Sequence, residues 1–137
     1  MPLEFTFTEE QELFRRTVRE LMAKQVAPRK KELLEARICT PEVHKALAGA
    51  GLSGLLIPTE FGGSGSDYVT FIVAVEELTR GDLTGFAGLP IWYGASCARL
   101  LSVYGNAELK EEILPKVAKE GWVTPLHNTE PGCGTDF

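Results

Sequence analysis

Cysteine and histidine are scarce in this sequence, whose 137 residues include three cysteines and two histidines. Cys39, Cys97 and Cys133 lie far apart, which fits neither a paired disulfide framework nor a CxxC metal site. The histidines, His44 and His127, form no zinc motif with their neighbours. We therefore expect no disulfide scaffold and no metal site, and we expect thiols that are kept in a reducing compartment.

Long runs of one charge and long apolar runs are also missing. The formal net charge is -5 with both signs interspersed, and the longest basic run, residues 29–31, is followed by Glu32 and Glu35 as on a solvated helix face. No window approaches the about 18 apolar residues of a membrane helix, and residues 1–5 lack the features of a signal peptide. We expect a soluble cytoplasmic protein without a membrane span, and nucleic acid is excluded as a partner.

Two helices are predicted in the first half of the chain. Thr8 and Gln11 have the form of a capping box, and apolar residues at helical spacing follow until Pro28 discourages continuation. Thr40, which precedes a proline, marks the start of a second helix. Gly51 can adopt the left-handed conformation that ends this helix.

Three more helices are predicted in the second half. Asp67 can cap a helix that runs to residue 80, and a mostly apolar segment of small residues, 83–104, suits a buried helix interrupted near Pro90. Asn106 caps the last helix, which Gly121 ends. The fold class is therefore all-α, an orthogonal or up-down bundle of about five helices, with a C-terminal extended segment that would start a β domain.

The segments between these helices are assigned by composition. Residues 52–57 are an apolar run too short for a helix, so we expect a buried extended segment. The glycine-rich residues 60–67 lack the GK[ST] ending of a phosphate loop, and Tyr68 replaces the third glycine of a GxGxxG frame, which favours a tight turn between helices. Residues 122–126 favour a strand that needs a partner. The domain boundaries follow as 1–121 and 122–137.

Catalytic candidates are few. No GxSxG elbow is present, and each cysteine is interpreted as a small buried apolar residue. Glu76 and Glu77 are neighbours on a helix, where they point in different directions, so we expect solvated charges rather than a paired acid and base. The hydroxyls of Thr129 and Thr135 bracket Pro131 and two glycines, so side-chain and backbone donors there could bind an anionic or heteroaromatic ligand. An ordinary surface turn is the alternative.

Residues 128–136, NTEPGCGTD, closely resemble the TEPxxGSD signature that opens the β-sheet middle domain of acyl-CoA dehydrogenases, with Thr135 where serine is usual. Three further stretches are similar to that family in the same order: FTEEQELFRRTVRELMAKQVAP, GLSGLLIPTEFGGSGSDYVTFIVAVEELTRGD and YGNAELKEEILPKVAKEG. The resemblance covers essentially the whole chain.

This resemblance implies an N-terminal helical domain, a middle β domain and a C-terminal helical bundle, with FAD between the last two. By position, Thr129 would hydrogen-bond the flavin ring. Thr135 would bond the flavin pyrophosphate and lie near the acyl-CoA thioester, and Leu126 and Asn128 would offer backbone contacts. The helices at 68–80 and 83–104 would form one wall of the acyl pocket, where Trp92 and Tyr93 are large enough to shape it, although we expect these two aromatic residues mainly in the core.

The family reaction is α,β-dehydrogenation of an acyl-CoA thioester, as in the β-oxidation of fatty acids, with hydride transfer to the flavin and then electron transfer to an electron-transfer flavoprotein. The family's glutamate base lies in the C-terminal bundle, so no glutamate of this chain is assigned that role. We expect an enzyme fragment that is inactive alone, binds FAD weakly or not at all, and belongs to a homo-oligomer. A flavin-dependent monooxygenase or acyl-CoA oxidase of the same fold, and a non-catalytic helical binding module, are the alternatives.

Overall fold

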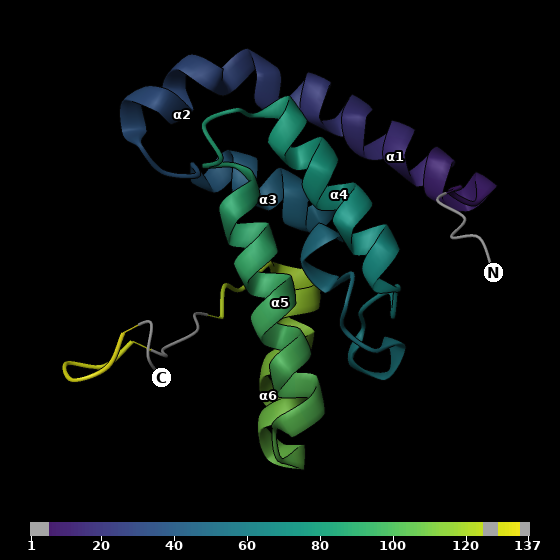
Figure 1. The fold of residues 1–137 in the computed structure, drawn as a ribbon, viewed down its shortest axis with the longest axis vertical. Helices are drawn as coiled ribbons and strands as arrows, with labels where there is room; N and C mark the ends of the chain where they lie inside the picture. The colour runs from purple at the N-terminus through teal and green to yellow at the C-terminus, as the bar shows by residue number, and fades with distance from the viewer. Residues whose placement is uncertain (1–5, 125–128, 135–137) are drawn as a thin grey trace.

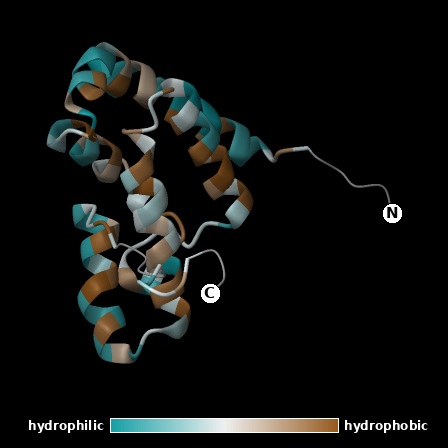
Figure 2. Cartoon of the chain, turned by 60° about the vertical axis from the view of Figure 1, so that its left-hand side comes forward, coloured by the Kyte–Doolittle hydropathy of each residue, from teal (hydrophilic) through white to brown (hydrophobic). Residues whose placement is uncertain are grey.

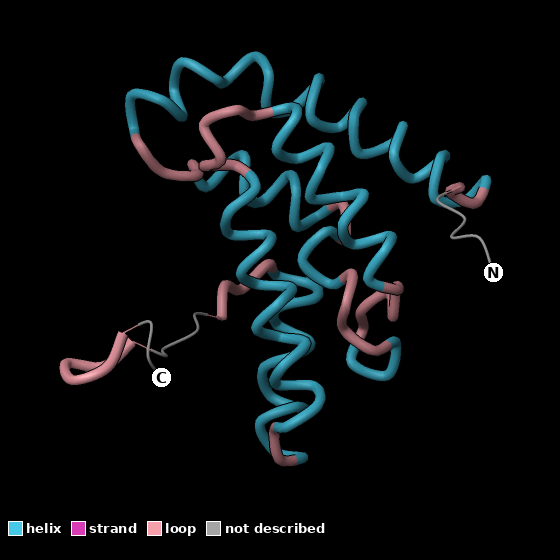
Figure 3. Tube along the Cα trace, viewed as in Figure 1, coloured by secondary structure: helices cyan, strands magenta, loops and turns pink. Residues whose placement is uncertain are grey.

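The structure, a computed structural model, describes residues 6–124 and 129–134. Helices and loops make up these residues, and no strand occurs among them (Figure 3). The prediction of an all-α fold is confirmed. The α-helices, shown in Figure 1, are α1 (Glu9–Leu21), α2 (Lys30–Ala36), α3 (Pro41–Gly49), α4 (Tyr68–Gly81), α5 (Gly88–Tyr104) and α6 (Ala107–Glu120).

The first helix begins as predicted and continues further than expected. Thr8 and Gln11 exchange two hydrogen bonds of 3.0 and 3.1 Å, which is the predicted capping box. After α1 the backbone widens into a π-helix, Met22–Val26, and tightens into a 3-10 turn, Ala27–Arg29, before α2. Pro28 does not end the helical path because it lies in the first turn of the 3-10 segment, where a missing N–H breaks no helical hydrogen bond. The sequence therefore did not predict α2.

The caps of α4 and α6 are confirmed. The Asp67 carboxylate accepts the N–H of Thr70 at 2.7 Å, and the Asn106 side chain accepts the N–H of Leu109 at 2.9 Å. The prediction for α5 was partly wrong, because the helix begins only at Gly88 and is not interrupted at Pro90. Pro90 lies in its first turn, where the backbone N–H would have no helical partner.

Residues 52–57 are buried as expected but are not extended. They form a 3-10 helix, Leu52–Gly54, and then a turn. The glycine-rich segment after them is the predicted turn between helices, with positive φ at Gly62 and Gly65. Its backbone folds back on the 3-10 turn, so that Ser64 N–H donates to the carbonyl of Gly54 at 2.9 Å and Gly65 N–H to that of Ile57 at 2.8 Å.

The core consists of two clusters of buried side chains. The first cluster joins α1, α3, α4 and the first half of α5, and its largest members include Met22, Leu47 and Leu78. The second, smaller cluster lies between α5 and α6: Ile57, Ala98, Leu114, Val117 and Ala118. Figure 2 shows hydrophobic and hydrophilic residues alternating along the helices, as expected where each helix buries one stripe.

One expected solvated charge is buried. The Glu77 side chain on α4 is 1% exposed, and both of its oxygens accept hydrogen bonds of 2.7 and 2.8 Å from the Arg19 guanidinium on α1. The expectation of a solvated Glu77 was wrong, because α1 packs along this face of α4 and supplies the paired cation that makes a buried carboxylate tolerable. Glu76, the next residue along the chain, has 46% of its side chain exposed.

Candidate functional site

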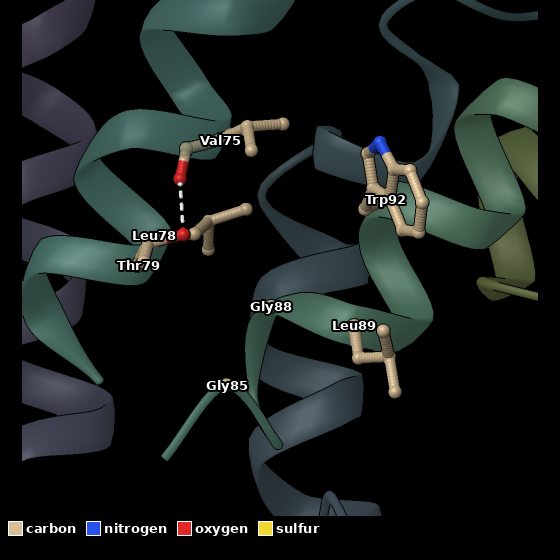
Figure 4. Close-up of a pocket in the computed structure, with 7 residues that line it drawn as sticks. All are labelled: Val75, Leu78, Thr79, Gly85, Gly88, Leu89 and Trp92. Atoms are coloured by element: carbon tan, nitrogen blue, oxygen red, sulfur yellow. Dashed lines mark hydrogen bonds between the residues drawn. The ribbon is translucent and has the colours of Figure 1, made fainter. Parts of the chain in front are cut away.

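An apolar pocket lies between α4 and α5, with a volume of about 170 Å³ (Figure 4). Val75 and Leu78 of α4 face Trp92 and Leu89 of α5 across it. Two of the lining side chains carry a polar group, the hydroxyl of Thr79 and the indole N–H of Trp92. The Thr79 hydroxyl turns to its own helix and donates to the carbonyl of Val75 at 2.9 Å. The pocket therefore offers mainly apolar surface to a ligand.

The loop between α4 and α5 is held by a buried carboxylate. Asp82 is fully buried, and its two oxygens accept the N–H and hydroxyl of Thr84 at 3.1 and 2.6 Å and the N–H of Ala87 at 2.9 Å. Gly85 and Gly88, which line the pocket, lie in or next to the segment that these hydrogen bonds organise. Asp82 thus fixes where α5 starts relative to α4. The sequence analysis missed this residue, although an acidic residue followed by Thr84 two positions later is a recognisable turn signal.

Trp92 and Tyr93 do not lie in the core. They are 42% and 39% exposed, and their rings meet edge to face with centroids 4.7 Å apart. The expectation of a mainly core position was wrong because α5 buries a different stripe, formed by Ile91, Ala95 and Ala98. Trp92 lines the pocket, and Tyr93 is not among the lining residues.

The predicted flavin-binding segment is only partly described. Leu126, Asn128 and Thr135 lie outside the described residues, as does His127. Thr129 is exposed and precedes a turn closed by reciprocal backbone hydrogen bonds between Glu130 and Cys133, at 2.9 and 3.1 Å.

The chain leaves α6 without forming a strand. No regular secondary structure is formed over residues 122–124. The strand expected from Trp122 onward stays a prediction, since a single strand needs a partner sheet.

Of the three cysteines that were interpreted as buried apolar residues, Cys97 is buried, whereas Cys39 and Cys133 are partly exposed. Burial, with a smaller contribution from the negative charge of Asp82, raises the pKa of Cys39 to about 11. Burial also raises the pKa of Cys97. Both thiols therefore stay protonated near neutral pH, which is unfavourable for nucleophilic chemistry. Within residues 6–124 and 129–134, His, Cys, Asp and Glu side chains form no group of three or more suited to a metal ion.

The described residues therefore form an α-helical domain with an apolar pocket between two helices, followed by a turn next to an exposed threonine. Residues 8–121 match the sequence model described as the N-terminal domain of acyl-CoA dehydrogenase. The chain belongs to the acyl-CoA dehydrogenase family. Among its described helices, none combines the length and the apolar character that a membrane span requires.

Individual relatives agree with this assignment. The chain is 35% identical to the short-chain specific acyl-CoA dehydrogenase of Clostridium acetobutylicum, over 98% of this chain and 35% of that protein. It is similar to a chain in the solved structure of the electron transferring flavoprotein of Acidaminococcus fermentans (TM-score 0.87, 32% identity, 98% of this chain and 35% of that chain).

A second solved relative is an acyl-CoA dehydrogenase complexed with FAD from Bacillus anthracis (TM-score 0.80, 26% identity, 95% of this chain and 22% of that chain). FAD is therefore bound by members of this family. The chain spans about a third of the length of the curated relatives it matches.

Proposed function

We propose that this chain supplies the N-terminal helical domain, and the beginning of the flavin site, of an FAD-dependent acyl-CoA dehydrogenase that forms the α,β double bond of acyl-CoA thioesters. The match of residues 8–121 to the family's N-terminal domain carries the proposal. The apolar pocket on that domain supports it, because the acyl part of such a substrate is a hydrocarbon chain and gains free energy when apolar surface leaves water.

In this proposal α4 and α5 form one wall of the acyl site, with Asp82 as the residue that holds the two helices in register. The electron acceptor is an electron-transfer flavoprotein, and the enzyme is a homo-oligomer. Similarity to a chain in the electron transferring flavoprotein structure of Acidaminococcus fermentans supports that choice of acceptor.

The described part of the C-terminal turn supports the proposal of a flavin site there. Thr129 is exposed, and an added Cβ at Gly132 would meet no atom, so a ring can approach the backbone closely. Hydroxyl and amide groups are suited to the carbonyl and nitrogen atoms of a heteroaromatic ring. Thr129 would hold the ring, with Thr135 near the pyrophosphate and the thioester and with backbone groups of Leu126 and Asn128 beside it. When bound, FAD supplies the hydride acceptor; the proton is removed by a base from outside this chain.

Replacing Trp92 by alanine is expected to change acyl-chain preference in the complete enzyme. The indole occupies one side of a small pocket, and in an apolar pocket one methylene is worth about 1–3 kcal/mol, so kcat/KM for octanoyl-CoA relative to butyryl-CoA should rise about tenfold or more. The measurement is steady-state kinetics with an artificial electron acceptor. Tyr93→Ala is the matched control, because it removes an equally exposed neighbour that does not line the pocket. An unchanged ratio in Trp92→Ala would remove this pocket from the acyl site.

The isolated 137-residue chain is expected to purify without colour and without dehydrogenase activity, because it provides one strip of a site that needs other surfaces. The check is its visible spectrum after incubation with FAD and gel filtration. Stoichiometric yellow flavin on the isolated chain would contradict this expectation.

The proposed function itself is tested by sequencing the gene beyond the codon for Phe137 and assaying the encoded product. A frame that continues through a β-rich segment into a helical bundle, with reduction of an electron acceptor by acyl-CoA, supports the dehydrogenase. Hydrogen peroxide formed from oxygen would assign the oxidase alternative instead, and an oxygenated product would assign the monooxygenase. A stop codon directly after Phe137 would favour the non-catalytic binding module.

A further inference from the structure

The segment that leaves α6, residues 121–124, is held between two helices that are distant from it in the sequence. On one side, His44 Nε2 of α3 lies 2.6 Å from the carbonyl oxygen of Gly121. On the other side, the Thr124 hydroxyl donates to the carbonyl oxygen of Gly94 in α5 at 3.4 Å. The exit from the last helix is therefore tied to α3 and to α5.

The chemistry of the two groups fixes the direction of the hydrogen bond between His44 and Gly121. A carbonyl oxygen can only accept a hydrogen bond, so Nε2 carries the proton and donates to Gly121. His44 Nδ1 is buried and makes no hydrogen bond within the described part of the chain. The imidazole thus uses one nitrogen, and that nitrogen is directed at the point where the chain departs from α6.

Gly121 packs closely against α3 at the position of this hydrogen bond. It ends α6 in the left-handed conformation, with φ of 73°, and it is buried. A Cβ at this position would collide with the Cβ of Ala48 and would lie 3.1 Å from His44 Nε2. The backbone therefore approaches α3 as closely as glycine permits, which is the approach that the His44 hydrogen bond requires.

Trp122, the residue after Gly121, makes its contacts with α6. Its N–H donates to the carbonyl of Lys116 at 3.4 Å, its indole Nε1 donates to Glu120 at 3.1 Å, and the Lys116 ammonium lies 4.8 Å from the ring centroid. These contacts bind Trp122 to α6 itself. The bonds of Gly121 and Thr124 are the ones that bind the exit to α3 and α5.

We propose that His44 is a positioning residue, whose hydrogen bond to Gly121 sets the direction in which the chain leaves the helical domain toward the turn at residues 129–134. The flavin-binding role of that turn rests on the proposed function above, whereas the His44 contact does not. The domain's own packing would then decide where the ligand-binding turn is presented.

The test is amide hydrogen exchange measured by NMR on the 137-residue chain. His44→Phe keeps a ring of similar size and removes the donor. We expect exchange at Gly121 and Trp122 to accelerate about fivefold, the change that corresponds to one lost hydrogen bond, while amides of α1 and α4 keep their rates. His44→Gln places an amide N–H within reach of the same carbonyl and should restore the slow exchange. Lys45→Gln, at an exposed neighbouring position on α3, is the matched control.

Three results would overturn the proposal: unchanged exchange at Gly121 and Trp122 in His44→Phe, an acceleration spread evenly over α1 and α4, or failure of His44→Gln to restore the wild-type rates. Even acceleration would show that His44 contributes only to global stability. None of these results depends on flavin, so failure here is separate from failure of the proposed function, which the gene sequence and the acyl-CoA assay decide.

Discussion

Gly63→Ala is expected to destabilise the domain by about 3 kcal/mol or more, because overpacking against backbone leaves no side chain that can move aside. A Cβ at position 63 would collide with the carbonyl oxygen of Ile57 and would lie 2.5 Å from the Ile57 Cβ and 2.6 Å from the carbonyl oxygen of Gly54. Relief requires the glycine-rich turn to separate from the 3-10 segment on which it folds, and this breaks the hydrogen bonds from Ser64 and Gly65 to that segment.

The measurement is urea unfolding followed by circular dichroism, and the control is Gly49→Ala. Gly49 is the last residue of α3, and an added Cβ there meets no atom within 4 Å. Since alanine is favoured over glycine in helices by up to about 1 kcal/mol, Gly49→Ala should be neutral or slightly stabilising. Equal midpoints for Gly63→Ala and wild type would show that the turn adapts without cost.

Glu77→Gln is expected to reduce the free energy of unfolding by about 1–2 kcal/mol, because the buried carboxylate loses charge-assisted hydrogen bonds to an Arg19 side chain that is partly screened by water, while the volume is kept. The Arg19 guanidinium donates from Nε and Nη2 to both carboxylate oxygens, at 2.8 and 2.7 Å. Glutamine offers one acceptor and presents an NH2 group to the second donor. Glu76→Gln is the matched control, because Glu76 is the partly exposed neighbour, and it should change stability far less.

The same pair predicts a pH dependence. The hydrogen bonds from Arg19 are the main reason that the pKa of Glu77 lies below its ordinary value of 4.5, an effect that burial partly opposes. A lowered carboxylate pKa contributes stability that is complete above 4.5 and is lost as pH falls through the folded-state pKa. Wild type should therefore lose stability on acidification below that value, and Glu77→Gln should lose less. The measurement is the melting temperature of the two proteins as a function of pH. If both melting temperatures fall equally on acidification, the loss of stability belongs to other carboxylates.

Local signals in the sequence predicted the starts of α1, α4 and α6 correctly. The caps Thr8, Asp67 and Asn106 are formed by side chains that reach backbone groups three residues away, so nothing distant is needed to predict them. The α2 helix was missed because Pro28 reads as a helix stop. Only the change to a π-helix and then a 3-10 turn lets the chain continue.

Contacts between helices that are distant in the sequence could not be predicted from local sequence patterns. Helix spacing placed Glu77 near the surface, and only the packing of α1 on α4 shows that Arg19 covers it. Trp92 was expected mainly in the core because it is large and apolar, yet the small residues of α5 occupy that face. The assignment of Thr129 to flavin binding rests on the family resemblance of the terminal turn, and its geometry with FAD stays a prediction.

The division of the core into two clusters has a consequence for how the domain opens. The second cluster is small, and α6 packs on α5, on α3 and on the segment between α3 and α4, so we expect α6 to open at a lower free energy than the helices of the larger cluster. Such an opening would release the turn that follows α6 and leave the pocket between α4 and α5 intact. The pocket and the turn, for which we propose ligand contacts, would then have separate local stabilities, and the hydrogen bond of His44 to Gly121 would link the exit from α6 to α3.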